Sequence, residues 1–340
     1  MDKYPHPEDL YKREYLDGGF SKGWGMHFKP VADYFYDSHT HYHEKHFPGG
    51  DIPDALLSKK DEMNELGIKK AMIFFKVYDH NGWQPQEGNV GPFYLIDDII
   101  KNKEFFNSQD SFFWGPYLRY LDPNLGIIKK GIEAGASCIK LHNAHIITDG
   151  AEPEIWFSEE WDKAFKEIEK TGLPVVWHVT QRRSECKYRK VGADSYWKDG
   201  VKKGITYSNE ELLQVFLKVV EKYPAIKFVG AHQLHIGWER LGELFDKYPN
   251  LYTDTSMGCF LNPDDDFYPD DYNYLRDFFI KYADRLMFGT DIYYEKCVER
   301  DFKFHFENRG HIRFINKLNL PEDVLQKIAY KNAEMIYVRK

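Results

Sequence analysis

Eight short apolar segments alternate with longer amphipathic ones, and this alternation limits the fold more than any other feature of the chain. In the longer segments, apolar residues recur at spacings of three and four, which predicts helices. The short segments are apolar on both faces, as is typical of strands buried between a barrel interior and a helical shell. The predicted strands are 34–41, 68–77, 112–120, 137–142, 173–179, 226–232, 251–256 and 285–291.

Eight strands, each followed by a helix over about 250 residues, predict an α/β fold of the (β/α)8 TIM-barrel type. We assign residues 33–340 to this catalytic barrel, residues 1–32 to an N-terminal extension and 321–337 to a C-terminal helical segment. A doubly wound open sheet is the alternative, but it would need a glycine-rich first turn that the sequence lacks. The basic, aromatic segment 181–207 is too long for a simple connection, which predicts a lid or a contact with a neighbouring subunit.

The charge balance narrows the range of partners. With 46 basic and 54 acidic side chains, the net charge is −8, which argues against a nucleic-acid binder and a membrane-surface protein. The N-terminus lacks the apolar run of a signal peptide, and no stretch approaches the ~18 apolar residues of a membrane span. The four cysteines are far apart and form no CxxC pair, as expected of reduced thiols. We therefore expect a cytoplasmic protein that acts on a small molecule, and a homodimer is compatible with the sequence.

Metal-ligand residue types lie where the predicted strands end. His39 and His41 are two apart on the first strand, so both side chains point the same way. His178, His232 and Asp291 end the fifth, sixth and eighth strands. Barrel enzymes build their active sites at these ends. Imidazoles and a carboxylate suit zinc, manganese or iron, so the sequence predicts a site for a divalent metal that activates water.

The motifs DSHTH, IKLH, WH, AH and FGTD on strands one, four, five, six and eight resemble those of the amidohydrolase superfamily. Within it, residues 33–338 resemble the amidohydrolase-related branch that contains aminocarboxymuconate semialdehyde decarboxylase, and KYPNLYTDTS and the closing helix with Asn332 agree. The resemblance implies one divalent metal, zinc first and manganese second. Its implied ligands are His39, His41, His178 and Asp291.

The resemblance also implies two catalytic roles. Asp291 accepts a proton from water, and His232 contacts the water or the substrate, although HQLHIG can also be aligned with His235 in that place. In binuclear members of the superfamily a lysine like Lys140 becomes carboxylated and bridges two metals. In the branch that this chain resembles, the corresponding residue contacts substrate. We expect the latter for Lys140 and His142, with an internal salt bridge of Lys140 as another alternative.

The substrate is less constrained by the sequence. Arg182 and Arg183 follow the fifth strand and Arg119 lies near the end of the third, and such cations could bind a substrate carboxylate in bidentate fashion. Solvated surface arginines are the alternative for each of them. The aromatic residues near strand ends suggest an aromatic-walled pocket, with barrel filling or helix packing as the alternative for most of them; they include Trp83, Trp114, Trp177 and Trp238. We expect a metal-dependent hydrolase of an amide, lactone or related bond in a small carboxylated substrate.

A non-oxidative decarboxylase on the same metal site is the alternative, and a non-catalytic ligand-binding barrel is the third hypothesis. The family's decarboxylases tend to begin strand one almost at the N-terminus, whereas about 30 residues precede it here, which favours hydrolysis.

Overall fold

The structure is a computed structural model, and the central part of the chain is described with internal gaps. The described residues are 32–42, 51–81, 93–108, 110–121, 125–180, 207–256, 269–291, 311–312, 314–316 and 318–338. The predicted N-terminal extension and nearly all of the segment 181–207 lie outside this part of the chain.

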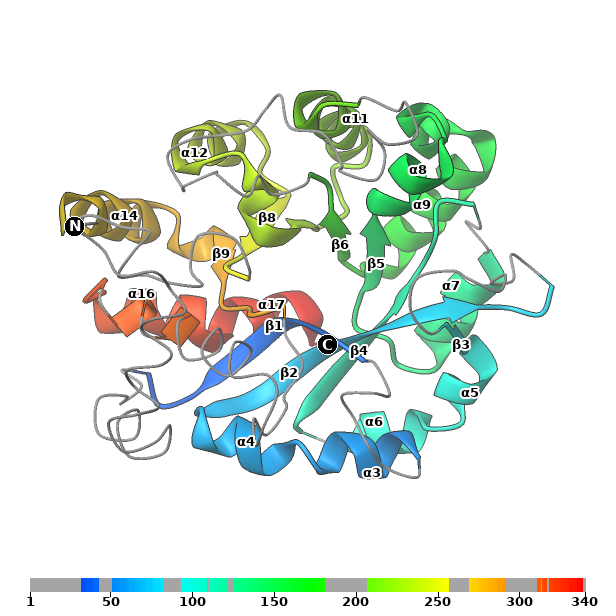
Figure 1. Cartoon of the computed structure of the whole chain (residues 1–340), viewed down its shortest axis with the longest axis horizontal. Helices are drawn as coiled ribbons and strands as arrows, with labels where there is room; N and C mark the ends of the chain where they lie inside the picture. Colours follow the sequence, from blue (N-terminus) through cyan, green and yellow to red (C-terminus); the bar gives the residue numbers. More distant parts are fainter. Residues whose placement is uncertain are drawn as a thin grey trace, which may run out of the picture.

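Eight parallel strands form one sheet that curves into a barrel (Figure 1). Each strand pairs with the next of the eight along the chain, and every one overlaps a predicted strand. The strands are β1 (Phe35–His41), β2 (Ile68–Tyr78), β4 (Phe112–Tyr117), β5 (Ile139–His142), β6 (Val175–His178), β7 (Phe228–Gly230), β8 (Leu251–Asp254) and β9 (Leu286–Met287). A two-residue strand, β3 (Tyr94–Leu95), pairs with the end of β2 outside this path.

Backbone hydrogen bonds between β1 and the residues that follow β9 bring the two ends of the sheet together. The Ser38 N–H donates to the Phe288 carbonyl at 2.9 Å, and the Asp291 N–H donates to the His39 carbonyl at 2.7 Å. The predicted TIM-barrel class is therefore confirmed. This junction also places Asp291 beside His39, although the two residues are far apart in sequence.

Helices surround the strands (Figure 1). They are α3 (Ile52–Leu57), α4 (Lys60–Glu65), α5 (Ile96–Ile100), α6 (Lys103–Ser108), α7 (Leu125–Glu133), α8 (Ala144–Asp149), α9 (Glu159–Thr171), α11 (Asn209–Lys222), α12 (Trp238–Lys247), α14 (Pro269–Lys281), α16 (Glu322–Gln326) and α17 (Asn332–Tyr337). Local sequence explains where they begin and end. Ser208 and Glu211 form a capping box at the start of α11, and Gly172 takes a left-handed φ of 70° after α9.

The C-terminal helices α16 and α17 (red in Figure 1) are joined by a π-helical turn at Lys327–Lys331. This turn lies against β1 and β9, and α17 also contacts β9. Asn332 ties this segment to the barrel, because its amide donates to the carbonyls of Ala283 at 2.6 Å and Leu286 at 2.7 Å. The predicted C-terminal helix with Asn332 is thus present. Among the described residues, no helix is long and apolar enough to cross a membrane.

Five predicted strands end earlier than the sequence pattern indicated, and in β7 and β9 the shortening changes the backbone at a site residue. β7 stops at Gly230, and residues 232–235 follow in a left-handed turn with φ between 49° and 58°. β9 stops at Met287, and Asp291 also has a positive φ of 60°. Apolar patterning marks the buried segment but not the point where the backbone turns, so it extended both strands to their polar residues.

Candidate metal centre

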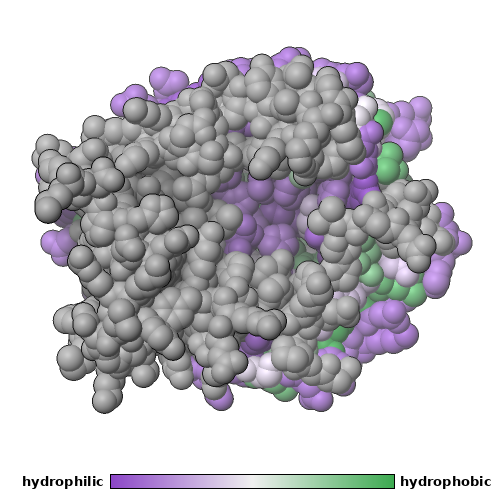
Figure 2. Space-filling model, viewed as in Figure 1, coloured by the Kyte–Doolittle hydropathy of each residue, from purple (hydrophilic) through white to green (hydrophobic). Residues whose placement is uncertain are grey.

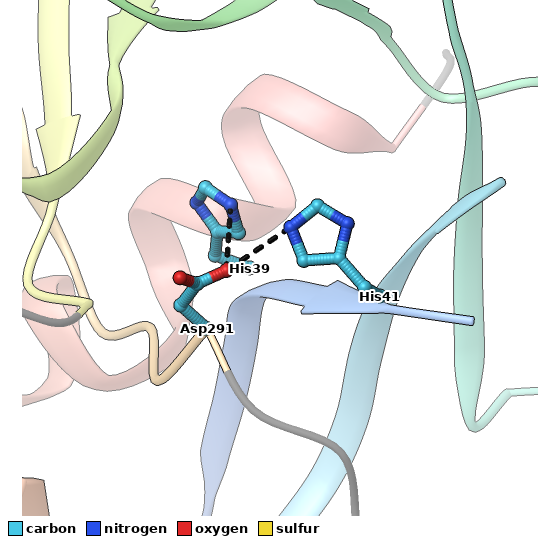
Figure 3. Close-up of side chains that lie close together, drawn as sticks. All are labelled: His39, His41 and Asp291. Atoms are coloured by element: carbon cyan, nitrogen blue, oxygen red, sulfur yellow. Dashed lines mark ion pairs between the residues drawn. The ribbon is translucent and has the colours of Figure 1, made fainter. Parts of the chain in front are cut away.

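His39, His41 and Asp291 form a compact group (Figure 3). The Oδ1 atom of Asp291 lies 3.3 Å from Nε2 of His39 and 3.0 Å from Nε2 of His41. Both imidazoles come from β1, where the alternation of side chains sends residues two apart to the same side. The side chain of His39 is fully buried, whereas those of His41 and Asp291 are 19% and 16% exposed. The group can therefore be reached from solvent at Asp291 and His41.

The ring of His39 is held from behind by Asp254, at the end of β8. Its Nδ1–H donates to Oδ2 of Asp254 at 2.8 Å, so Nε2 is the nitrogen that faces Asp291. Asp254 is fully buried and also accepts from the His232 N–H and the Ser256 N–H, each at 3.1 Å. A carboxylate behind a ring nitrogen is the usual second partner of a metal-binding histidine, because it sets the tautomer and the ring orientation.

Asp37 of β1 holds the backbone segment that leads to Asp291. Its Oδ1 accepts from the Thr290 N–H at 3.0 Å and the His39 N–H at 3.2 Å, and its Oδ2 accepts from Oγ1 of Thr290 at 2.5 Å. Gly289 is equally constrained, because a Cβ at this position would lie 2.9 Å from Oγ of Ser38 and 3.2 Å from Cβ of Asp254. In the FGTD motif, Gly289 allows the backbone to pass close to Ser38 and Asp254, and Thr290 hydrogen-bonds to Asp37 of β1. Asp291 supplies the carboxylate of the group.

His232 lies next to Asp291, in the left-handed turn after β7. Its Nδ1–H donates to Oγ of Ser256 at 2.8 Å, and its Nε2 lies 3.9 Å from Oδ2 of Asp291. Four consecutive non-glycine residues with positive φ are energetically unfavourable. Side chains of β8 compensate for this, since Asp254 accepts from the His232 N–H and Oγ1 of Thr253 accepts from the Gln233 N–H at 3.1 Å.

His178 and His235 extend the cluster beyond His232. Nδ1 of His178 lies 3.1 Å from Nε2 of His232, and the His235 ring stacks on His232 with 5.3 Å between centroids. His178 contacts His232 and is not one of the compact group of three. Its role as a fourth metal ligand stays a prediction, and so does the choice of His232 over His235.

Lys140 reaches into the same site from β5. Its Nζ is fully buried, 3.0 Å from Nε2 of His39, and lies 4.9 Å from the centre of the Phe74 ring. Burial lowers the pKa of Lys140 to about 8, even though the carboxylates of Asp291 and Asp254 oppose that change. The lysine thus faces the same nitrogen that faces Asp291.

His142 stacks on His178, with 4.0 Å between their ring centroids, and on Tyr117 at 5.8 Å. Burial and the neighbouring His178 hold the pKa of His142 well below its usual value. Lys140 and His142 therefore both point into the barrel mouth, where a substrate contact is feasible.

The other predicted substrate contacts are placed differently. Arg119, just after β4, is paired with Asp149 of α8. Arg182 and Arg183 lie outside the described residues, as does Trp83.

The three remaining predicted pocket tryptophans do not line the site. Trp114, Trp177 and Trp238 are all at most 3% exposed and pack in the main hydrophobic core. Trp177, for example, packs on Trp156 at 4.6 Å and donates its N–H to Oδ1 of Asn143 at 3.0 Å. The alternative of core packing therefore holds for these three: Trp114 and Trp177 lie on β4 and β6 and face the helical shell, and Trp238 lies on α12.

Ionisation of the group follows from its contacts. Burial raises the pKa of Asp291, but the His39 and His41 imidazoles outweigh this and bring the pKa well below its usual range. Burial lowers the pKa of His41 to about 4 although Asp291 opposes it, and the pKa of His232 is lowered well below its usual value for the same reason. The site at neutral pH thus offers an ionised Asp291 carboxylate beside the neutral imidazoles of His41 and His232.

Comparison with known proteins decides the family. The amidohydrolase family profile matches residues 124–339, more than half of the chain. This chain belongs to the amidohydrolase family. No curated protein matches its sequence.

Solved structures with the same fold support the architecture of this amidohydrolase. Dihydroorotase from Campylobacter jejuni has 15% identity and a TM-score of 0.55, over 92% of this chain and 86% of that chain. 2,6-Dihydroxybenzoate decarboxylase from Rhizobium has 16% identity and a TM-score of 0.54, over 90% and 98%. 5-Carboxyvanillate decarboxylase from Sphingomonas paucimobilis has 12% identity and a TM-score of 0.52, over 91% and 100%. At these identities the likeness shows the fold alone.

The residues of the group fit the divalent metal that amidohydrolases usually require. Nitrogen atoms of His39 and His41 and a carboxylate oxygen of Asp291 lie within 4.8 Å of one another. The Nδ1–H of His39 is directed to Asp254, which leaves the Nε2 lone pair for the site. Figure 2 shows that hydrophilic residues gather in a hollow near the middle of the face in view.

Sequence reasoning missed Asp254 and Asp37 as parts of the site. Asp254 ends β8, so the strand-end rule that selected the histidines could have selected it as well. Asp37 lies in the DSHTH motif, two residues before His39. Neither carboxylate is in the compact group of three, and only their hydrogen bonds to His39, His232 and Thr290 reveal their role.

Proposed function

We propose that this amidohydrolase is a metal-dependent hydrolase of an amide, lactone or related bond in a small carboxylated substrate. The observation that carries the proposal is the position of Asp291. One of its oxygens faces His39 and His41, and the other lies 3.9 Å from Nε2 of His232. An ionised carboxylate in this position can accept a proton from an attacking water molecule. The adjacent His232 can relay that proton, or can polarise the scissile carbonyl once its Nε2 is protonated.

We propose zinc, with manganese as the second choice, held by His39, His41 and Asp291 with His178 as the fourth ligand. Imidazole and carboxylate ligands suit these ions. A divalent metal bound there would supply Lewis-acid chemistry and make hydroxide available near neutral pH. Lys140 and His142 would contact the substrate, and we place Arg182 there as well.

Non-oxidative decarboxylation is the second candidate. Two of the three solved structures compared above are a 5-carboxyvanillate decarboxylase and a 2,6-dihydroxybenzoate decarboxylase, and the third is a dihydroorotase. The ammonium of Lys140, 3.0 Å from Nε2 of His39, provides a proton donor beside the group, as a reaction that protonates carbon requires. Release of CO2 from a carboxylated aromatic substrate would favour this reaction over hydrolysis.

The first experiment is metal analysis of the purified protein beside the His39→Ala/Asp291→Ala double variant. We expect about one zinc or manganese per chain, lost in the variant. About two per chain would bring Lys140 into the site as a carboxylated bridge. No metal, even after zinc or manganese is supplied, would contradict the proposal.

If the protein binds one metal, lactones, amides and carboxylated aromatics are then screened for hydrolysis and for CO2 release. Hydrolysis of a lactone or an amide without CO2 would support the proposed function.

A further inference from the structure

Ser256, the second residue after β8, lies between the carboxylate of Asp254 and the ring of His232. Its N–H donates to Oδ1 of Asp254 at 3.1 Å, and its hydroxyl donates to the same oxygen. Its carbonyl accepts from Nε2 of Gln233 at 3.1 Å, and that amide also donates to the Asp254 carbonyl at 2.7 Å. Ser256 is fully buried, so these contacts hold it in one position.

The direction of the Ser256 hydroxyl follows from the charge of Asp254. Burial raises the pKa of Asp254, but the contacts with His39 and Ser256 outweigh this and bring the pKa below its usual range. An ionised carboxylate only accepts hydrogen bonds, so the single hydroxyl proton of Ser256 is directed to Asp254. The hydroxyl oxygen therefore acts as an acceptor for its second partner.

That second partner is Nδ1 of His232. It lies 2.8 Å from Oγ of Ser256 and 3.3 Å from the Ser256 carbonyl oxygen. A carbonyl oxygen also only accepts, so both contacts require a proton on Nδ1. A neutral imidazole has one N–H, and Nε2 of His232 consequently carries an electron pair and no proton.

The same reasoning extends to His178, whose Nδ1 lies 3.1 Å from Nε2 of His232. Because Nε2 of His232 accepts in this contact, Nδ1 of His178 is the donor, and a neutral His178 carries its electron pair on Nε2. His39 has the same tautomer, since its Nδ1–H donates to Asp254 directly. One buried carboxylate thus sets the tautomers of three imidazoles, two of them through Ser256.

We propose that Ser256 is a positioning residue that fixes His232 and His178 as their Nδ1–H tautomers. The consequence for turnover rests on the proposed function. His232 cannot polarise a scissile carbonyl in the resting protein, because its Nε2 must first receive a proton. His178 presents an electron pair on Nε2, as its proposed role as fourth ligand requires.

The test reads the tautomers from the 15N chemical shifts of the ring nitrogens, because protonated and unprotonated nitrogens of a neutral imidazole differ widely in shift. Spectra of metal-free protein labelled with 15N-histidine are recorded at pH 8, above the ordinary imidazole pKa of about 6.5. His142 is an internal reference for the opposite tautomer, since the Ala144 N–H donates to its Nδ1 at 2.9 Å. Spectra of His232→Asn and His178→Asn assign the two signals.

The variants compared are Ser256→Ala and Ser38→Ala. Ser38 is the matched control, because it is also a buried serine beside the site, but its hydroxyl donates to the Phe288 carbonyl at 2.6 Å. Ser256→Thr keeps the hydroxyl and serves as the conservative variant. Melting temperatures show that each variant is folded.

We expect the Nδ1–H tautomer for His232 and His178 in the wild type. Ser256→Ala should shift the tautomer ratio of His232 towards Nε2–H by up to about tenfold, as the loss of one hydrogen bond predicts, and His178 should change with it. Ser256→Thr and Ser38→Ala should keep the wild-type tautomers.

An Nε2–H tautomer of His232 in the wild type would overturn the inference. Unchanged signals of both histidines in a folded Ser256→Ala protein would overturn it as well. These spectra are recorded without metal, so the zinc content of a second, zinc-supplied sample shows separately whether the proposed function fails.

Discussion

Nδ1 of His39 lies 2.8 Å from Oδ2 of Asp254, and both side chains are fully buried. The same carboxylate accepts backbone N–H groups of His232 and Ser256 through its other oxygen. Asp254 therefore positions two imidazoles of the site at once, one through its ring and the other through its backbone. The geometry of the proposed metal centre depends on a residue that is not in the group of three.

We expect Asp254→Asn to weaken zinc binding by about 10- to 100-fold. Asparagine has one acceptor oxygen, so its NH2 group must face either the ring N–H of His39 or the two backbone N–H groups. Unfolding free energy should also fall by about 1–3 kcal/mol, because a buried donor loses its partner. Competition with a chromophoric chelator measures the zinc affinity. Asp246→Asn, at an exposed carboxylate on α12, is the matched control, and equal zinc affinity in the two variants would refute the positioning role.

A methyl group at position 289 should disturb the metal centre through packing alone. In Gly289→Ala the new Cβ would lie 2.9 Å from Oγ of Ser38 and 3.4 Å from Cβ of His39. We expect a loss of about 1–3 kcal/mol in unfolding free energy, together with weaker zinc binding. Gly131→Ala on α7 is the control, because its nearest contact would be an ordinary 3.4 Å and alanine favours a helix. Denaturant unfolding measures the unfolding free energy of both variants, and similar values for the two would contradict the packing argument.

Asp291→Asn should abolish turnover of any substrate that the wild type processes while keeping much of the bound zinc. The amide oxygen can still face His39 and His41, but an amide does not accept a proton as a carboxylate does. The fold should persist, since asparagine tolerates the φ of 60° found here. Zinc content and turnover are measured on one preparation. A fully active Asp291→Asn protein would exclude the proposed proton transfer.

The half-buried His145 should make the metal-free protein less stable in mild acid. Burial lowers the pKa of His145 from 6.5 to about 4. As the pH falls below about 6.5, the unfolded chain takes up a proton that the folded chain refuses, so stability is lost between about pH 6.5 and pH 4.

His145→Gln removes this term and keeps a hydrogen-bonding group beside Tyr117. Between pH 7.5 and pH 5.0 the variant should lose up to about 2 kcal/mol less unfolding free energy than the wild type. Urea unfolding at the two pH values tests this. An identical pH dependence of variant and wild type would show that His145 is not buried in its neutral form.

The sequence by itself determined the barrel and most of its chemistry. Buried strands are apolar on both faces and helices are apolar on one. The local spacing of apolar residues therefore predicts the number and order of these elements. Because parallel strands end at the same rim, His39, His41 and Asp291 could be expected together before any contact was known.

Only the tertiary structure decided how those residues are held. His232 lies in the left-handed turn that follows β7, which apolar patterning does not reveal, and there its Nε2 meets Nδ1 of His178. Asp254 and Asp37 acquire their roles from hydrogen bonds between strands far apart in sequence. Such contacts depend on register and backbone direction, which are set by the closed barrel as a whole and not by any one segment.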